Sequence, residues 1–245
     1  MGGESEDTNI TITQRTHAMA LPKNKVITDD VISQINDYGL DVINREIFLF
    51  PREDYIHGGV DEDFEPGVEY GMAGRFIRHM RLLANISHDP ILIHLKTEGG
   101  DWVQGLAMYQ AIKASPCRIV MLNYASARSM SSVIFSAADH RVMMPFSTFM
   151  IHTGTNCIVG TGTQVMTEYE EIQKADKIMY DIYIGHLRGS EMMKGWSDKK
   201  IDTWIRKQMK EKEDVYFNAE EAVDHNFADT IFGADGVYDW DALIK

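Results

Sequence analysis

Ser129 is the first of three serines, with Ser131 and Ser132, at the head of an apolar segment that predicts a helix over residues 130–138. The N–H of Met130 would then lie unpaired at the positive end of the helix dipole. A serine hydroxyl beside such an N–H supplies a nucleophile and an oxyanion donor, the two parts that acyl transfer needs. Serines also cap helices, and taken alone these residues favour a cap over a nucleophile.

Two further features lie at the ends of predicted strands. The segment "HLKTEGGD" closes one apolar strand with Gly99 and Gly100, which either make a simple turn or let their N–H groups approach a ligand closely. His152 closes the strand "FSTFMI" and could be the base that a serine hydroxyl needs before it becomes a good nucleophile. A histidine after an apolar strand is more often structural, so it is the strand-end position that makes His152 a candidate.

The elements that would position these residues alternate between strand and helix, which predicts an α/β fold with a mainly parallel sheet. We expect the segment "NYASAR" to be the turn that leads into Ser129. The predicted strands are 45–50, 91–95, 118–122, 140–144 and 146–151. The predicted helices are a short one within 26–40, then 72–86, 102–115, 130–138 and 163–188.

The predicted organisation is a flexible segment over 1–25 followed by a single domain over 26–245. Within that domain, residues 51–71 hold many acids, glycines and prolines, and we expect a surface insertion there. The long helix carries apolar residues on more than one narrow stripe, whereas a helix on the surface of a monomer needs only a stripe about 100° wide. This surplus predicts a homo-oligomer.

Composition excludes several classes of function. The net charge of −13 makes a nucleic-acid partner a poor match, because phosphate binding needs clustered Lys and Arg. No apolar run reaches the ~18 residues of a membrane span, and the acidic start differs from a signal peptide, so we expect a cytoplasmic protein without a membrane partner. Cys117 and Cys157 show no metal-ligand spacing and are interpreted as two buried thiols, with a disulfide as the alternative. We expect neither a metal nor a cofactor.

Four segments resemble, in the same order and at similar spacing, the motifs of the Clp protease proteolytic subunit family (ClpP). The family's "SPGG", "ASMGA", "LPNSxxMIH" and "RDxxxSAxEAxxxGLxD" are similar to "TEGG" (97–100), "RSMSS" (128–132), "MPFSTFMIH" (144–152) and "EDVYFNAEEAVDHNFAD" (213–229). The resemblance covers roughly residues 35–233. It implies the crotonase/ClpP-like fold, built from repeated β-β-α and βα units, with a protruding strand–helix handle over 153–188.

The resemblance also implies roles for residues. Ser129 would be the nucleophile, His152 the general base and Asp214 the carboxylate that orients the histidine. Gly100 and Met130 would supply the N–H groups of the oxyanion hole. Without the resemblance, Asp214 belongs to a charged run that indicates only a solvated surface.

The implied activity is that of an ATP-dependent-type serine endopeptidase subunit that acts on peptides or unfolded proteins. The resemblance implies stacked homo-oligomeric rings with the active sites enclosed in a chamber, and a separate AAA+ unfoldase as partner. The chain has no phosphate-binding loop of the G-x-x-x-x-G-K-[ST] type, so ATP would be used only by that partner.

The sequence departs from the family pattern beside the site. Glu98 stands where the family has proline and places a negative charge near a site that must stabilise an oxyanion, while Arg128 precedes the nucleophile. The segment after His152, "TGTNCIVGTG", only loosely matches the family's substrate-binding strand. Two alternatives stay open: a catalytically silent or scaffold ring subunit, and a crotonase-type acyl-CoA enzyme, against which the order of the triad argues.

Overall fold

The computed structural model describes residues 29–50, 67–234, 236 and 239–243. Within these residues, eight strands form one sheet in the order β1-β2-β3-β4-β5-β8, and β6 pairs with both β4 and β7. The strands are β1 (Leu40–Asp41), β2 (Glu46–Leu49), β3 (Ile91–Thr97), β4 (Ile119–Arg128), β5 (His140–Met143), β6 (Thr148–Ile151), β7 (Val215–Asn218) and β8 (Thr230–Ile231).

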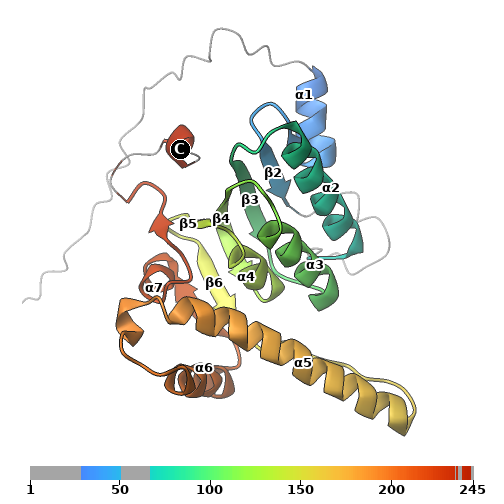
Figure 1. Cartoon of the computed structure of the whole chain (residues 1–245), viewed down its shortest axis with the longest axis vertical. Helices are drawn as coiled ribbons and strands as arrows, with labels where there is room; N and C mark the ends of the chain where they lie inside the picture. Colours follow the sequence, from blue (N-terminus) through green and yellow to red (C-terminus); the bar gives the residue numbers. More distant parts are fainter. Residues whose placement is uncertain (1–28, 51–66, 235, 237–238, 244–245) are drawn as a thin grey trace, which may run out of the picture.

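The helices are α1 (Asp29–Ser33), a π-helical turn (Gln34–Tyr38), α2 (Tyr70–Ile86), α3 (Trp102–Lys113), α4 (Met130–Phe135), α5 (Gly162–Leu187), a 3-10 turn (Glu191–Met193), α6 (Asp198–Lys212), α7 (Ala219–Asp224) and α8 (Trp240–Leu243). The predicted helices are present, whereas α6, α7 and α8 were not predicted (Figure 1). The predicted flexible segment 1–25 lies outside the described residues.

The sheet is mainly parallel, as the sequence predicts. Among the described strands only the β1–β2 and β6–β7 pairs are antiparallel. Strand β4 is ten residues long and pairs with β5 through its first half and with β6 through Ser126–Arg128. The prediction that "NYASAR" is a turn was therefore wrong. These residues continue the strand, because the second half of β4 has its own partner in β6.

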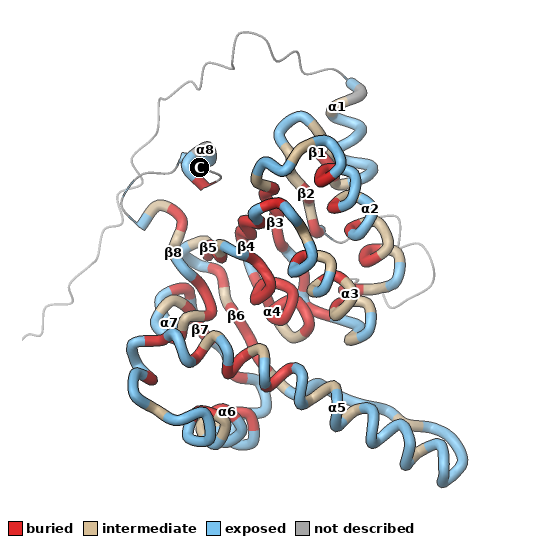
Figure 2. The backbone as a smooth tube through the Cα atoms, viewed as in Figure 1, coloured by how far each residue is buried: buried red, intermediate tan, exposed pale blue. Residues whose placement is uncertain are grey.

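Strands β3 and β4 carry buried residues on both faces, and helices α2, α3 and α4 lie on one side of the sheet (Figures 1 and 2). Ile91, Ile93 and Leu95 of β3 face the main core, on the side where α2, α3 and α4 pack. Leu92 points to the opposite face and joins a second apolar cluster that includes Leu243 of α8. A strand that is buried on both faces reads as a continuous apolar run, which is why "ILIHL" and "RIVML" were readable from sequence.

Residues 51–66 of the predicted surface insertion 51–71 lie outside the described residues. Its last residues, 67–71, belong to the fold. Val68 is buried and bridges to Gly100, and α2 begins at Tyr70. The carboxylate of Glu69 caps α2 by accepting hydrogen bonds from the N–H groups of Gly71 and Met72. Within 67–71, Val68 is thus part of the core, whereas Tyr70 is exposed.

Helix α5 projects from the body of the protein (Figure 1). A capping box between Thr161 and Gln164 fixes its start. Its buried residues all lie in the last third, from Met179 to Leu187, and its projecting end is exposed (Figure 2). Residues 153–161 form no strand. The predicted handle therefore consists of helix α5 and an extended segment that runs beside it (Figure 1).

Both cysteines are free, which confirms the absence of a disulfide between them. Cys117 is buried as predicted, whereas Cys157 is exposed. No helix in the described ranges is long and apolar enough to cross a membrane.

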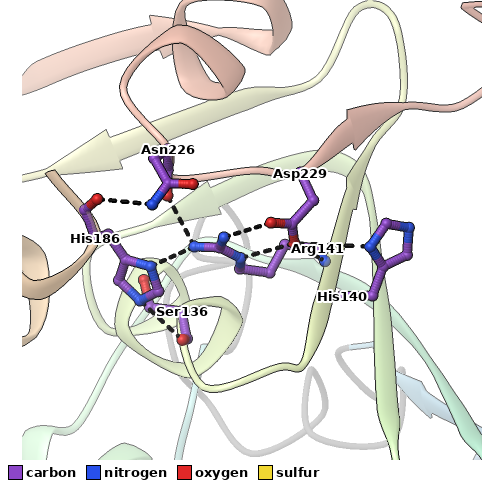
Figure 3. Close-up of polar contacts among 6 residues, drawn as sticks. All are labelled: Ser136, His140, Arg141, His186, Asn226 and Asp229. Atoms are coloured by element: carbon purple, nitrogen blue, oxygen red, sulfur yellow. Dashed lines mark hydrogen bonds and ion pairs between the residues drawn. The ribbon is translucent and has the colours of Figure 1, made fainter. Parts of the chain in front are cut away.

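Arg141 of β5 anchors the base of α5 to the sheet (Figure 3). Its guanidinium donates two hydrogen bonds to the Asp229 carboxylate, Nε at 3.0 Å and a terminal nitrogen at 2.6 Å. The other terminal nitrogen donates to the Asn226 carbonyl at 2.8 Å and to Nδ1 of His186 on α5. Nε2 of His186 donates to the Ser136 carbonyl at 3.0 Å, so the ring is neutral, with its proton on Nε2.

This arrangement predicts that acid destabilises the fold. Burial and the neighbouring Arg141 lower the pKa of His186 to about 4, from an ordinary value of 6.5. Between those two pH values the unfolded chain binds a proton that the folded chain does not, so stability falls as pH falls from about 6.5 to about 4. We expect a loss on the order of 3 kcal/mol from this residue, with His140 adding in the same direction.

Urea unfolding at pH 7 and pH 4.5 measures the loss. His186→Asn keeps an acceptor for Arg141 and removes the titrating ring, so it should reduce the difference in unfolding free energy between the two pH values. His88→Asn, at an exposed position, is the matched control and should leave that difference as in the wild type. An equal pH dependence in His186→Asn and the wild type would contradict this account.

Candidate active site

Ser129 lies directly between β4 and α4. Its backbone has φ 52° and ψ −125°, a conformation that non-glycine residues rarely adopt. The N–H of Ser129 donates to the Met150 carbonyl at 3.1 Å, which ties this sharp turn to β6. The turn separates the serine side chain from both the strand and the helix, so its hydroxyl is free to meet a partner from another element.

That partner is His152. His152 follows the last residue of β6, and Asp214 precedes the first residue of β7. The two strands are antiparallel and pair Ile151 with Val215, so the next position along the ladder brings His152 and Asp214 together. His152 Nδ1 lies 2.9 Å from Asp214 Oδ1, and His152 Nε2 lies 2.7 Å from Ser129 Oγ.

These distances assign the protons. A carboxylate only accepts, so Nδ1 of His152 carries the hydrogen and donates it to Asp214. Nε2 is then the lone-pair nitrogen and accepts from the Ser129 hydroxyl. The histidine is thus in the tautomer that takes a proton from serine, which is the arrangement that general-base activation of a serine requires.

Gly99 and Gly100 lie beside this serine with φ 106° and 146°. A Cβ at Gly99 would lie 2.6 Å from the Ser129 Cβ, and one at Gly100 would lie 2.3 Å from the Val68 carbonyl oxygen. Both positions therefore require glycine. The N–H of Val68 donates to the Gly99 carbonyl, and the Val68 carbonyl accepts from the N–H of Asp101. Among the described residues, the N–H of Gly100 donates to no backbone carbonyl.

Met130 opens α4, so its N–H belongs to the first helical turn, whose N–H groups have no partner within the helix. Met130 directly follows Ser129, and Gly99, the residue before Gly100, lies beside Ser129. The service of Gly100 and Met130 as oxyanion donors stays a prediction.

The two neighbouring serines are placed differently from Ser129. Ser131 is fully buried, and its hydroxyl has no hydrogen-bond partner within the described part of the chain. Ser132 donates to the Ser129 carbonyl at 2.6 Å, and its oxygen lies 2.7 Å from the hydroxyl of Tyr183 on α5. Ser132 therefore supports the turn that presents Ser129.

Glu98 and Arg128 were singled out separately in the sequence, and the structure pairs them. A terminal nitrogen of Arg128 donates to the Glu98 carboxylate, and its other terminal nitrogen donates to the hydroxyl of Tyr216. The negative charge expected beside the oxyanion site is thus balanced by a positive one. Sequence reasoning missed Tyr216 and Val68, which neither charge nor periodicity distinguishes.

Comparison with known proteins agrees with this fold. The sequence profile described as Clp protease matches residues 64–235. The ATP-dependent Clp protease proteolytic subunit 2 of Pseudomonas aeruginosa is 27% identical over 188 residues, covering 76% of this chain and 83% of the relative. The protein of the same name from Treponema denticola is 24% identical over 186 residues, covering 75% of this chain and 82% of the relative.

Among solved structures, a ClpP1 mutant from Listeria monocytogenes superimposes with a TM-score of 0.60 at 18% identity. The match covers 82% of this chain and 96% of the Listeria chain, and it shows a common fold. The fold is the mixed α/β architecture of ClpP, and the chain belongs to the Clp protease family.

The hydrogen bond from His152 to Asp214 makes a testable prediction. Asp214→Asn replaces an acceptor with an amide that can hold the ring in the wrong tautomer, so any peptide hydrolysis that depends on this triad should fall by about 10⁴-fold, as in a triad peptidase of unrelated fold. The side chain of Asp214 is 49% exposed, so the fold should persist. Initial rates on a short fluorogenic peptide measure the effect, with Glu213→Gln, at an exposed neighbour, as control. A rate equal to that of the wild type would remove Asp214 from the site.

Proposed function

We propose that this chain is a ClpP-type serine endopeptidase subunit that hydrolyses peptide bonds in unfolded protein substrates. The observation that carries the proposal is the continuous chain of hydrogen bonds from Asp214 through His152 to Ser129. Gly99 lies beside Ser129, and Met130 opens α4 directly after it. The N–H groups of Gly100 and Met130 are the proposed donors to a substrate oxygen.

The proposed reaction uses these groups in order. His152 Nε2 takes the Ser129 proton as Oγ attacks the peptide carbonyl carbon, and Asp214 stabilises the imidazolium that forms. The N–H groups of Gly100 and Met130 stabilise the oxyanion. His152 then gives its proton to the leaving amine, and a water activated by the same nitrogen hydrolyses the acyl-enzyme. No metal or cofactor takes part.

The same proposal includes assembly. The projecting part of α5 exposes apolar side chains, with Met166 61%, Tyr169 52% and Ile178 41% exposed. A second copy of the chain would remove this surface from water, as ring stacking does in the proposed particle. A closed chamber would restrict the site to unfolded chains, delivered by a separate AAA+ unfoldase in the cytoplasm.

A fluorophosphonate probe tests the proposed function. We expect covalent labelling of Ser129 in the wild type and in Ser131→Ala, and none in Ser129→Ala. Ser129→Ala should also abolish peptide cleavage while leaving the fold intact, because it removes one oxygen from a turn. Absence of labelling in a folded, assembled wild type would favour the catalytically silent subunit, and labelling that disappears only in Ser131→Ala would overturn the assignment of the nucleophile.

The exposed face of α5 gives a second prediction. Met166→Glu and Ile172→Glu should shift the sedimentation coefficient towards smaller species and lower peptidase activity, although both residues lie on α5 away from the triad. Met179 is a poor choice, because it is buried and a charge there would unfold the chain. Gln173→Glu, at an exposed polar position on the same helix, is the control. A fully active wild-type monomer at working concentration would contradict the assembly.

A further inference from the structure

Arg128, the residue before Ser129, joins two side chains from other parts of the chain. Its two terminal nitrogens donate to the Glu98 carboxylate and to the Tyr216 hydroxyl, and its guanidinium carbon lies 5.0 Å from the centre of the Tyr216 ring. The other carboxylate oxygen of Glu98 accepts from the Ser126 hydroxyl at 2.5 Å. We call Glu98, Arg128 and Tyr216 the Arg128 clamp.

Each member of the clamp is next to a group of the candidate site along the chain. Glu98 precedes Gly99 and Gly100, Arg128 precedes Ser129, and Tyr216 is two residues after Asp214. The clamp therefore links three elements, the ends of β3 and β4 and the start of β7. These are the elements that carry the predicted oxyanion glycine, the nucleophile and the orienting carboxylate.

Backbone pairing leaves these elements only partly fixed. The β3–β4 register is regular up to Leu95 and shifts before Thr97, so the end of β3 has an irregular ladder just before the glycines. Strands β4 and β7 are joined only through β6, whose Met150 pairs with Arg128 on one side and Tyr216 on the other. Arg128, Met150 and Tyr216 therefore lie side by side on three neighbouring strands, and the guanidinium of Arg128 reaches across β6 to Tyr216.

The contacts indicate a positioning role and argue against substrate binding. Both terminal nitrogens of Arg128 are used within the chain, and Nε is buried without a partner among the described residues. Burial would raise the pKa of Glu98, but the hydrogen bonds from Ser126 and Arg128 outweigh it and hold that pKa below its usual value. The pair is therefore ionised and mutually neutralised near neutral pH, and it offers no free charge to a substrate.

We propose that the Arg128 clamp positions the Gly99–Gly100 segment and Asp214 relative to Ser129, and that Arg128 is a positioning residue of the reaction. This inference rests on the proposed function. The planar guanidinium of arginine can donate to two partners at once, whereas the compact ammonium of lysine presents a single point charge. Small displacements of reacting groups cost large factors in rate, up to about 10²-fold for 1 Å.

Three conservative variants test the clamp. Tyr216→Phe removes one hydroxyl, Glu98→Gln removes the charge but keeps an acceptor for Ser126, and Arg128→Lys keeps the charge but loses the fork. We expect each to lower kcat on a short peptide by about 5- to 100-fold with KM changed less than about 3-fold. The rate at which a fluorophosphonate labels Ser129 should fall in parallel.

The double variant Glu98→Gln/Arg128→Lys should show a smaller loss of kcat than the product of the two single losses, because the residues act as a unit.

A matched control exists on α6. Arg206 donates to Asp202 at 2.7 Å and lies over the Tyr180 ring at 3.8 Å, so it makes the same types of contact away from the site. Arg206→Lys should leave kcat and labelling unchanged. Thermal unfolding and sedimentation of every variant separate loss of position from loss of fold or assembly.

The outcomes distinguish the two proposals. Wild-type labelling rates and kcat in all three clamp variants, or a change confined to KM, would overturn the clamp and leave the proposed function standing. Rates that fall only in proportion to lost folded or assembled protein would also overturn the clamp. Failure of the wild type itself to label at Ser129 would overturn the proposed function, and the clamp with it.

Discussion

Strand β6 is hydrogen-bonded on both sides, and the geometry of the site depends on that double pairing. Its parallel register with β4 fixes the position of Ser129 along the sheet, and its antiparallel register with β7 fixes the position of Asp214. His152 directly follows the last residue of β6. Successive side chains of a strand point to opposite faces, so a slip of one residue in either ladder would turn part of the site away. The apolar, buried inner face of β6 stabilises both registers, because Phe149 and Ile151 are fully enclosed in the core.

The projecting helix α5 is connected to the turn at Ser129 through buried side chains. Tyr183 of α5 is fully buried, and its hydroxyl meets Ser132, which in turn donates to the Ser129 carbonyl. One turn further along the helix, His186 is bonded to Arg141 and Ser136. The last third of α5 is therefore fixed to the parts of the molecule that shape the site, while its first two-thirds extend beyond the core. A force on the projecting end of α5 would therefore reach the turn at Ser129 through packed and hydrogen-bonded side chains.

Much of this structure could be predicted from sequence because its signals are local. Strands buried on both faces appear as unbroken apolar runs, and α2 and α5 show helical periodicity and end at recognisable residues. The partnership of β4 with β6 could not be predicted, since pairing between strands about 20 residues apart leaves no local pattern, and "NYASAR" was consequently read as a turn. Ser129 was suggested by its place at the head of a predicted helix, and His152 by its place at the end of a predicted strand. Asp214 was not, because one acid among 37 in a charged run carries no signal until it is placed opposite a histidine. The sequence showed Glu98 and Arg128 as separate charges, and only the fold shows that they meet.

The backbone at Ser129 has an energetic consequence. Its φ of 52° and ψ of −125° suit glycine, and a side chain in such a region costs about 1–3 kcal/mol. Glycine would remove that cost and the hydroxyl together. A chain of this fold that had no use for a hydroxyl at this position would therefore gain folding stability from glycine here. Serine at this position has an energetic cost, which a chemical use of its hydroxyl, such as the one proposed for Ser129, would offset.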